Sequence, residues 1–273
     1  MCAPPHSHTL EAEGFYILEG DLTVGVGGQT FECQRGDFVY VPKTAPHEFM
    51  VNSATAKFLV TITPAGFEEF FREVSEGPAR AATWPSSGGA VPPIERIMEA
   101  GEKYKWRPEF EPRSLGVEVS QKIFFSACHT GKRFKLGGGL IVLKATREQT
   151  EDRFSVSEWF GPRDWKIPSL TYAQQGTTYY GLDGEFRISC PNEPFSLRAG
   201  EMVYVPPGVA HSVEVATRFA RMVVCATESA IEELALVGEA LIADDELKLD
   251  GKIPIDQGKL ARIGSDTTAW TIV

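Results

Sequence analysis

The sequence predicts an all-β protein that contains two copies of one barrel-like domain, together with a few short helices. The first observation is a repeat: shifted by 164 positions, the 273-residue chain matches itself without a gap. The second is that runs of strand-forming residues alternate with glycine turns in both copies. A repeat of this length indicates a duplicated domain. The matched positions include Tyr16 and Tyr180, Gly36 and Gly200, His47 and His211, and Glu68 and Glu232.

The expected elements of the first copy follow one another closely. Residues 15–26 predict two strands joined by a turn, and residues 31–42 predict a strand, a glycine turn and a buried strand. Residues 57–64 predict a further strand. Residues 64–74 predict a short helix, because a proline opens the segment and apolar residues recur at helical spacing.

Composition along the chain predicts the domain boundaries. Residues 1–75 are expected to form an N-terminal metal-binding domain, and the stretch after them is rich in Pro, Gly, Ser and Ala. We therefore expect a linker over residues 76–112. Residues 113–235 are expected to form the second domain, and residues 236–273 a polar tail that wraps irregularly.

The two copies differ in length at their beginning. Residues 122–164 precede the matching region of the second copy, and nothing in the first copy corresponds to them. The first barrel is therefore expected to be N-terminally truncated and incomplete. Because natural proteins avoid open sheet edges, we expect its edge to be covered by the linker, by the tail after residue 243 or by another chain.

Four residues of the first copy predict a metal site, namely His6, His8, Glu13 and His47. His6 and His8 stand two positions apart, so on a strand both side chains point to one face. Three imidazoles and a carboxylate suit Fe, Cu, Ni, Mn or Zn, and they leave coordination positions open, as in catalytic sites. The alternative is that His6 and His8 are exposed on a frayed terminus and that His47 is a hydrogen-bonded core residue.

The second copy does not retain this set of residues. The same offset places Leu170, Tyr172 and Thr177 where the first copy has His6, His8 and Glu13, and only His211 remains. We therefore expect a structural second barrel in which His211 is a hydrogen-bonded core residue. A metal-free pocket for a small molecule, lined by Tyr172 and His211, is the alternative.

Composition excludes several classes of protein. A net charge of −10 without a basic run argues against nucleic acid and anionic membranes as partners. The five cysteines are scattered and lack a CxxC motif, so they predict neither a disulfide framework nor a zinc ribbon. The chain shows no apolar stretch long enough to span a bilayer and no signal peptide, which predicts a cytoplasmic protein. The sequence leaves a homodimer open.

The motifs resemble those of a known family. PHSH, with Glu13 five residues further on and then FYILEGD, resembles the first cupin motif, and GDFVYVPKTAPH resembles the second. The second copy keeps YYGLDGE and GEMVYVPPGVAH. The chain therefore resembles a two-domain cupin, or bicupin, of the quercetin-dioxygenase-like group, over residues 4–70 and 120–235.

This resemblance implies jelly-roll barrels (double-stranded β-helices) and a metal-dependent oxygenase. One divalent transition metal (Fe, Cu, Ni or Mn) and dioxygen would act on a flavonol-like or other phenolic or enolic small molecule. The resemblance also implies that Glu13 takes the proton from the substrate hydroxyl, although Glu13 as a ligand only remains open. The alternatives are an isomerase, cyclase or decarboxylase that uses the metal as a Lewis acid or no metal, and a non-enzymatic bicupin of pirin-like or storage type.

Overall fold

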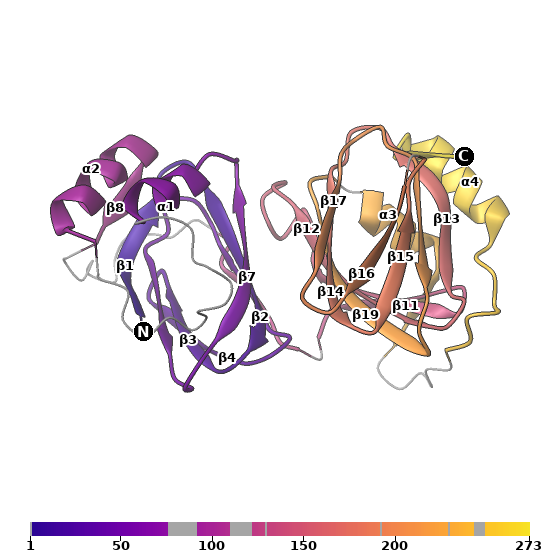
Figure 1. Ribbon diagram of the computed structural model, residues 1–273, viewed down its shortest axis with the longest axis horizontal. Helices are drawn as coiled ribbons and strands as arrows, with labels where there is room; N and C mark the ends of the chain where they lie inside the picture. The colour runs from indigo at the N-terminus through magenta and orange to yellow at the C-terminus, as the bar shows by residue number, and fades with distance from the viewer. Residues whose placement is uncertain are drawn as a thin grey trace. The chain divides into compact units, whose positions relative to one another are not determined.

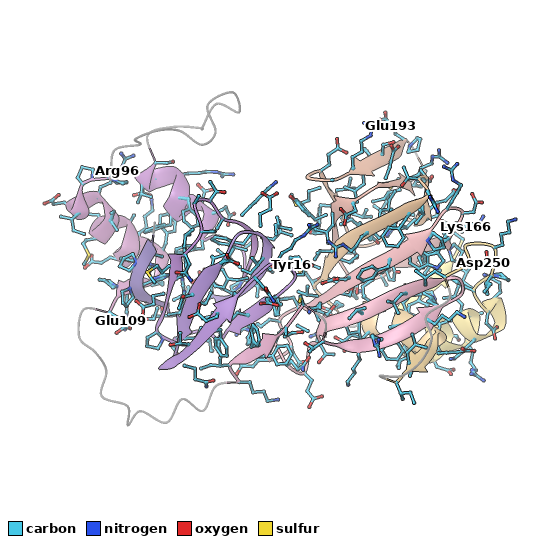
Figure 2. All side chains as sticks on the ribbon, turned by 90° about the horizontal axis from the view of Figure 1, so that it is seen from below. Tyr16, Arg96, Glu109, Lys166, Glu193 and Asp250 are labelled. Carbon is cyan, nitrogen blue, oxygen red and sulfur yellow. The ribbon has the colours of Figure 1, made fainter. Side chains whose placement is uncertain are left out.

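The computed structural model describes residues 2–75, 92–109, 122–128, 130–191, 193–228, 230–242 and 249–273. The chain divides into two compact units, residues 1–128 and residues 129–273 (Figure 1). Each unit is built from two antiparallel sheets, with apolar side chains filling the space between them (Figure 2). The predicted all-β fold of two cupin-like barrels is confirmed.

The first unit pairs a five-stranded sheet in the order β4-β3-β6-β1-β8 with a four-stranded sheet in the order β7-β2-β5-β9. Its core lies between them, where Phe15 and Ile17 of β2 meet Leu22 and Val24 of β3. Alternating residues of β3 are buried, as a strand with one core-facing side requires. The strands are β1 (Cys2–His8), β2 (Ala12–Glu19), β3 (Leu22–Val26), β4 (Gln29–Cys33), β5 (Phe38–Val41), β6 (His47–Val51), β7 (Lys57–Thr63), β8 (Trp106–Pro108) and β9 (Phe124–Ser126).

The second unit repeats this plan on a larger scale. A five-stranded sheet in the order β16-β15-β18-β13-β21 accompanies a seven-stranded sheet in the order β17-β14-β19-β12-β11-β10-β20. The strands are β10 (Lys132–Leu136), β11 (Gly139–Ala145), β12 (Ser155–Pro162), β13 (Lys166–Tyr172), β14 (Thr177–Asp183), β15 (Glu185–Ser189), β16 (Pro194–Arg198), β17 (Met202–Val205), β18 (His211–Val215), β19 (Phe219–Ala226), β20 (Glu239–Leu241) and β21 (Trp270–Ile272).

Two helices accompany each barrel in the described part of the chain. In the first unit they are α1 (Glu68–Val74) and α2 (Ile94–Tyr104), which contact each other. In the second unit they are α3 (Ala230–Val237) and α4 (Gln257–Thr267), which also contact each other. The helix expected over residues 64–74 is therefore present, although it begins four residues later than predicted.

The repeat extends further than the sequence motifs. The offset of 164 also places Trp106 on Trp270, and the two tryptophans begin β8 and β21. Trp106 pairs with His8 of β1, and Trp270 pairs with Tyr172 of β13 in the same register. A helix followed by a strand is thus part of each repeat.

Two predicted boundaries need correction. The linker predicted over residues 76–112 is wrong for residues 92–109, which supply α2 and β8 to the first unit, while residues 76–91 and 110–112 lie outside the described residues. The tail predicted over residues 236–273 is wrong for α4 and β21, which complete the second barrel. Both segments are polar, but each buries a few apolar residues against its barrel, and composition alone did not reveal this.

The extra residues before the second repeat are divided between the units. Strand β9 pairs with β5 of the first unit, whereas β10, β11 and β12 extend the second unit outward from β19. Segments beyond residue 75 therefore do complete the first barrel in part, as expected, but they are β8 and β9. Strand β8 lies in the predicted linker, which was one of the expected candidates, whereas the described residues 249–273 of the tail belong to the second unit. Among the described residues, β7 ends its sheet, while its counterpart β19 pairs with β12.

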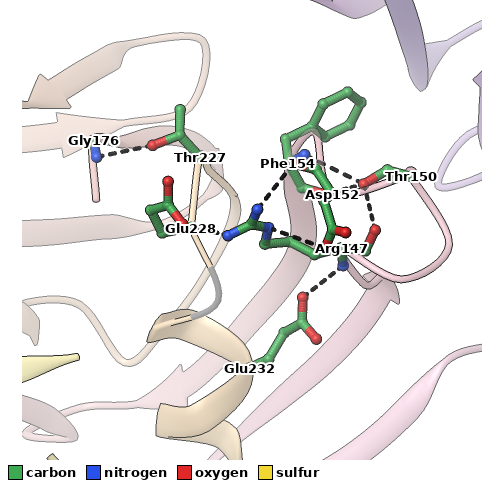
Figure 3. A network of polar contacts seen from close by, with 8 residues as sticks. All are labelled: Arg147, Thr150, Asp152, Phe154, Gly176, Thr227, Glu228 and Glu232. Atoms are coloured by element: carbon green, nitrogen blue, oxygen red, sulfur yellow. Dashed lines mark hydrogen bonds and ion pairs between the residues drawn. The ribbon is translucent and has the colours of Figure 1, made fainter. Parts of the chain in front are cut away.

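A polar network anchors the loop after β11 to α3 in the second unit (Figure 3). The backbone N–H of Arg147 donates to Glu232 Oε1 at 2.7 Å, and its guanidinium contacts Glu228 and donates to the carbonyl oxygen of Asp152 at 3.0 Å. Thr150 hydroxyl donates to the carbonyl oxygen of Phe154 in the same loop. Charge-assisted bonds of this kind hold the loop against the helix.

Candidate metal centre

The four predicted residues converge inside the first barrel. His6 and His8 lie on β1, and His47 begins the neighbouring strand β6, where it pairs directly with His6. Glu13 lies on β2 in the opposite sheet. Each of the four is at most 9% exposed. The expected alternative, in which His6 and His8 are exposed on a frayed terminus, does not describe this structure.

The strand period explains why both histidines of β1 face inward. Ser7, which stands between them, points away and donates from its hydroxyl to Glu109 Oε1, just beyond β8, at 2.7 Å. Alternate residues of a strand point to opposite faces, so His6 and His8 share the face that Ser7 leaves.

The distances within the cluster are those of a compact ligand set. Glu13 Oε2 lies 3.0 Å from His47 Nε2, and Glu13 Oε1 lies 3.3 Å from His8 Nε2. One ligand atom from each of the four residues lies within 4.8 Å of all the others. Bonds of about 2.0–2.2 Å from N and O to a d-block ion require ligand atoms that lie close together in this way. The donor set therefore fits a divalent transition metal.

Backbone carbonyl groups orient two of the three imidazoles. His6 Nδ1 lies 2.7 Å from the carbonyl oxygen of Pro4, and His47 Nδ1 lies 2.9 Å from that of Ala45. With Nδ1 engaged in this way, Nε2 is the nitrogen left to face the centre of the cluster. Histidines that bind a metal commonly donate a hydrogen bond from the N–H of their second ring nitrogen to such an acceptor.

The protonation states also suit a cation. Burial lowers the pKa of His6 to about 3 and that of His8 to about 4. Burial alone would raise the pKa of Glu13, but its contact with His47 and the nearby histidines outweigh this, so the pKa is lowered. At neutral pH His6 and His8 are therefore neutral and the carboxylate of Glu13 is charged. Metal binding needs these forms.

Aromatic side chains close one side of the cluster. Phe67, just before α1, packs edge-on against His8 with ring centroids 4.3 Å apart, and Trp106 of β8 lies 5.6 Å from His6. Phe70 of α1 packs on both Phe67 and Trp106. Phe71, on the same helix, is 55% exposed. Trp106 was not among the residues predicted from the sequence, although its match to Trp270 in the repeat would have placed it beside β1.

In the second unit a tyrosine contacts His211, the one residue of the metal cluster that the second repeat retains. Leu170 pairs with His211 in the register that His6 shares with His47. Tyr179 replaces Phe15 of the first repeat, and its hydroxyl lies 2.7 Å from His211 Nε2. His211 Nδ1 lies 3.0 Å from the carbonyl oxygen of Val209. Both ring nitrogens of His211 are thus engaged in the core, as the sequence predicted.

Comparisons with known proteins agree with this fold and site. The cupin domain profile matches residues 3–62. Quercetin 2,3-dioxygenase of Bacillus subtilis is 23% identical over 229 residues, which cover 81% of this chain and 68% of that protein. An uncharacterized protein of Methanocaldococcus jannaschii is 37% identical over 43 residues, which cover 16% of this chain and 34% of that protein.

Solved structures of Bacillus subtilis oxalate decarboxylase share the fold. One of them, described by its Mn(II) centres, has a TM-score of 0.57 and 18% identity and covers 83% of this chain. The chain spans about two-thirds of the length of that protein, with 66% of it covered. The structure of the same enzyme at pH 4.6 has a TM-score of 0.55 and 18% identity, and the match covers 83% of this chain and 65% of that one.

The first barrel, with histidine and glutamate residues on these strands, matches a cupin domain, and the second barrel repeats its fold. The chain therefore has the fold of a bicupin, and it is similar in sequence to quercetin 2,3-dioxygenase. None of the described helices is both long and apolar enough to cross a membrane.

Proposed function

We propose that this protein is a metal-dependent cupin oxygenase that acts on a flavonol-like or other phenolic or enolic small molecule. The observation that carries the proposal is the convergence of His6, His8, Glu13 and His47 inside the first barrel. The similarity to quercetin 2,3-dioxygenase, which extends over 81% of the chain, supports the reaction class.

In this proposal the four residues hold one divalent ion, which would be Fe, Cu, Ni or Mn because imidazole and carboxylate ligands suit each of them. When bound, such an ion supplies Lewis acidity and redox chemistry toward dioxygen. Phe67 and Trp106 keep bulk water from the cluster and present apolar surface to an aromatic substrate. Dioxygen and the small molecule are the proposed partners.

Glu13 is the proposed general base. Its carboxylate is buried and has a lowered pKa, so it is deprotonated at neutral pH and can accept the proton of a substrate hydroxyl at Oε1 or Oε2.

A metal-dependent decarboxylase is the second candidate. The fold similarity to oxalate decarboxylase supports it, with a TM-score of 0.57. The aromatic side chains beside His6 and His8 favour the phenolic substrate over a small polar diacid, because they offer mostly apolar surface, with the indole N–H of Trp106 as their one hydrogen-bond donor.

The first experiment measures the metal content of the protein. Purified protein is expected to contain close to one transition metal per chain by elemental analysis, because only one such cluster was found in the described residues. His47→Ala should abolish the metal content, whereas His211→Ala, its matched control in the second barrel, should retain it. Equal loss from both variants, or a metal-free wild type under metal-replete expression, would refute the site.

The second experiment tests Glu13 with a flavonol and with oxalate. Glu13→Gln should keep much of the metal but lose about 10²–10⁴-fold in the rate of oxygen uptake, because an amide does not accept a proton near neutral pH. Full activity in this variant with metal retained would leave Glu13 a ligand only. Release of carbon dioxide from oxalate without net oxygen uptake would favour the decarboxylase.

A further inference from the structure

His8 is the one imidazole of the cluster whose Nδ1 has no backbone acceptor among the described residues. His6 and His47 each direct Nδ1 to the carbonyl oxygen of the residue two positions earlier. For His8 that residue is His6, which is already paired in the sheet with both β6 and β8. His8 Nδ1 is accordingly buried without a hydrogen-bond partner in the structure.

A second buried atom without a hydrogen-bond partner lies beside it. Glu11 is only 6% exposed, and its Oε2 makes no hydrogen bond in the described structure. Glu11 Oε2 and His8 Nδ1 are 3.8 Å apart. A buried polar atom without a partner costs about 1–3 kcal/mol, so two such atoms that face each other call for an explanation.

We propose that Glu11 is a positioning residue for the metal site, a role that rests on the metal-binding function proposed above. Its carboxylate accepts the hydrogen bond from His8 Nδ1–H and keeps His8 Nε2 directed toward Glu13. A ligand bond at Nε2 leaves the ring proton on Nδ1, where Glu11 receives it. A small rotation of the Glu11 side chain, which lies in the short turn between β1 and β2, shortens 3.8 Å to a hydrogen bond of about 2.7–2.9 Å.

The proposal assigns different acceptors to the three histidines. His6 and His47 are held by carbonyl oxygens that no side-chain substitution removes, whereas His8 depends on one carboxylate. Loss of an acceptor of this kind weakens metal binding by about 10–100-fold in other metalloproteins. An amide oxygen can still accept the Nδ1–H bond, so Glu11→Gln should rescue most of the loss seen in Glu11→Ala.

The test uses Co²⁺ as the probe with the full-length, chelator-treated protein. Visible absorption titrations against a competing chelator give the dissociation constant for the wild type, Glu11→Ala, Glu11→Gln and the control Glu48→Gln, an exposed glutamate next to His47. We expect binding about 10–100-fold weaker for Glu11→Ala, and binding within about threefold of the wild type for Glu11→Gln and for the control.

A spectroscopic readout separates positioning from a general structural effect. In the Co²⁺ protein, paramagnetically shifted proton NMR should show one exchangeable ring N–H for each of His6, His8 and His47. In Glu11→Ala only one of the three, that of His8, should shift or exchange faster with water.

Each outcome bears on a different claim. Unchanged Co²⁺ affinity and three unchanged N–H signals in Glu11→Ala would overturn the role of Glu11 while leaving the metal site intact. A lowered melting temperature of Glu11→Ala with unchanged Co²⁺ binding would also overturn it. Absence of Co²⁺ binding by the wild type would instead overturn the proposed metal function and, with it, this role.

Discussion

Acidification of the metal-free protein should destabilise it through His6 and His8. Both histidines have folded-state pKa values below their ordinary value of 6.5, at about 3 and about 4, because burial disfavours the charged ring. Between those values and 6.5 the unfolded chain binds more protons than the folded chain. The contribution of these two histidines to the unfolding free energy is therefore fully present above pH 6.5, and it is lost as the pH falls toward 4.

The magnitude at pH 5 depends little on the folded-state values, because both lie below that pH. Each pH unit below 6.5 lowers the unfolding free energy by about 1.36 kcal/mol per histidine. At pH 5 each of the two histidines should therefore lower it by about 2 kcal/mol. Together they withdraw about 4 kcal/mol, a large share of a typical unfolding free energy of 5–15 kcal/mol. Bound metal should oppose the loss, because only neutral imidazoles bind it.

Urea-induced unfolding of chelator-treated protein at pH 7.5 and pH 5 measures this loss. The double variant His6→Gln/His8→Gln removes both titrating groups, so its loss between the two pH values should be smaller than that of the wild type by about 4 kcal/mol. An identical pH dependence in the wild type and the double variant would refute the reasoning, since the two histidines would then titrate alike in the folded and unfolded chains.

Two further predictions concern the second unit. Tyr179→Phe removes the partner of His211 Nε2 and should lower the unfolding free energy by about 1–3 kcal/mol without changing metal content; an undiminished unfolding free energy would argue against a structural role for this pair. Arg147→Met removes the guanidinium contacts to Glu228, just before α3, and to Asp152 in the same loop (Figure 3), and it should lower the unfolding free energy in urea by about 1–3 kcal/mol, whereas the exposed control Arg187→Met should change it by less than about 0.5 kcal/mol. Equal effects of the two arginine variants would contradict the anchoring role.

The four candidate metal ligands were predictable because they stand in local patterns. The i, i+2 spacing of His6 and His8 determines that they share a strand face, and the neighbouring motif places His47 at the start of another strand. The loss of the ligand set from the second barrel was equally visible, since substitution at the matched positions is a property of sequence alone. The partner of His211 could not be predicted from the sequence, because Tyr179 contacts it only through the packing of β14 against β18.

The sequence by itself also contained more of the fold than composition indicated. Trp106 and Trp270 match at the offset of the repeat. The helix and strand that complete each barrel were therefore visible in the sequence, in segments whose composition indicated a linker and a tail. A three-residue strand such as β8 carries too few residues for a periodic signal, and its polar surroundings mask its role.

Only the tertiary structure decided how residues 122–164 are divided between the barrels. Strand β9 pairs with β5, while β10, β11 and β12 join β19, and no local pattern distinguishes these outcomes. The burial of Glu11 and His8 was also decided by the tertiary structure, although the two residues stand only three positions apart in the chain. Local sequence sets which way a side chain points from its strand, but the partners it meets depend on pairing between strands distant in the chain.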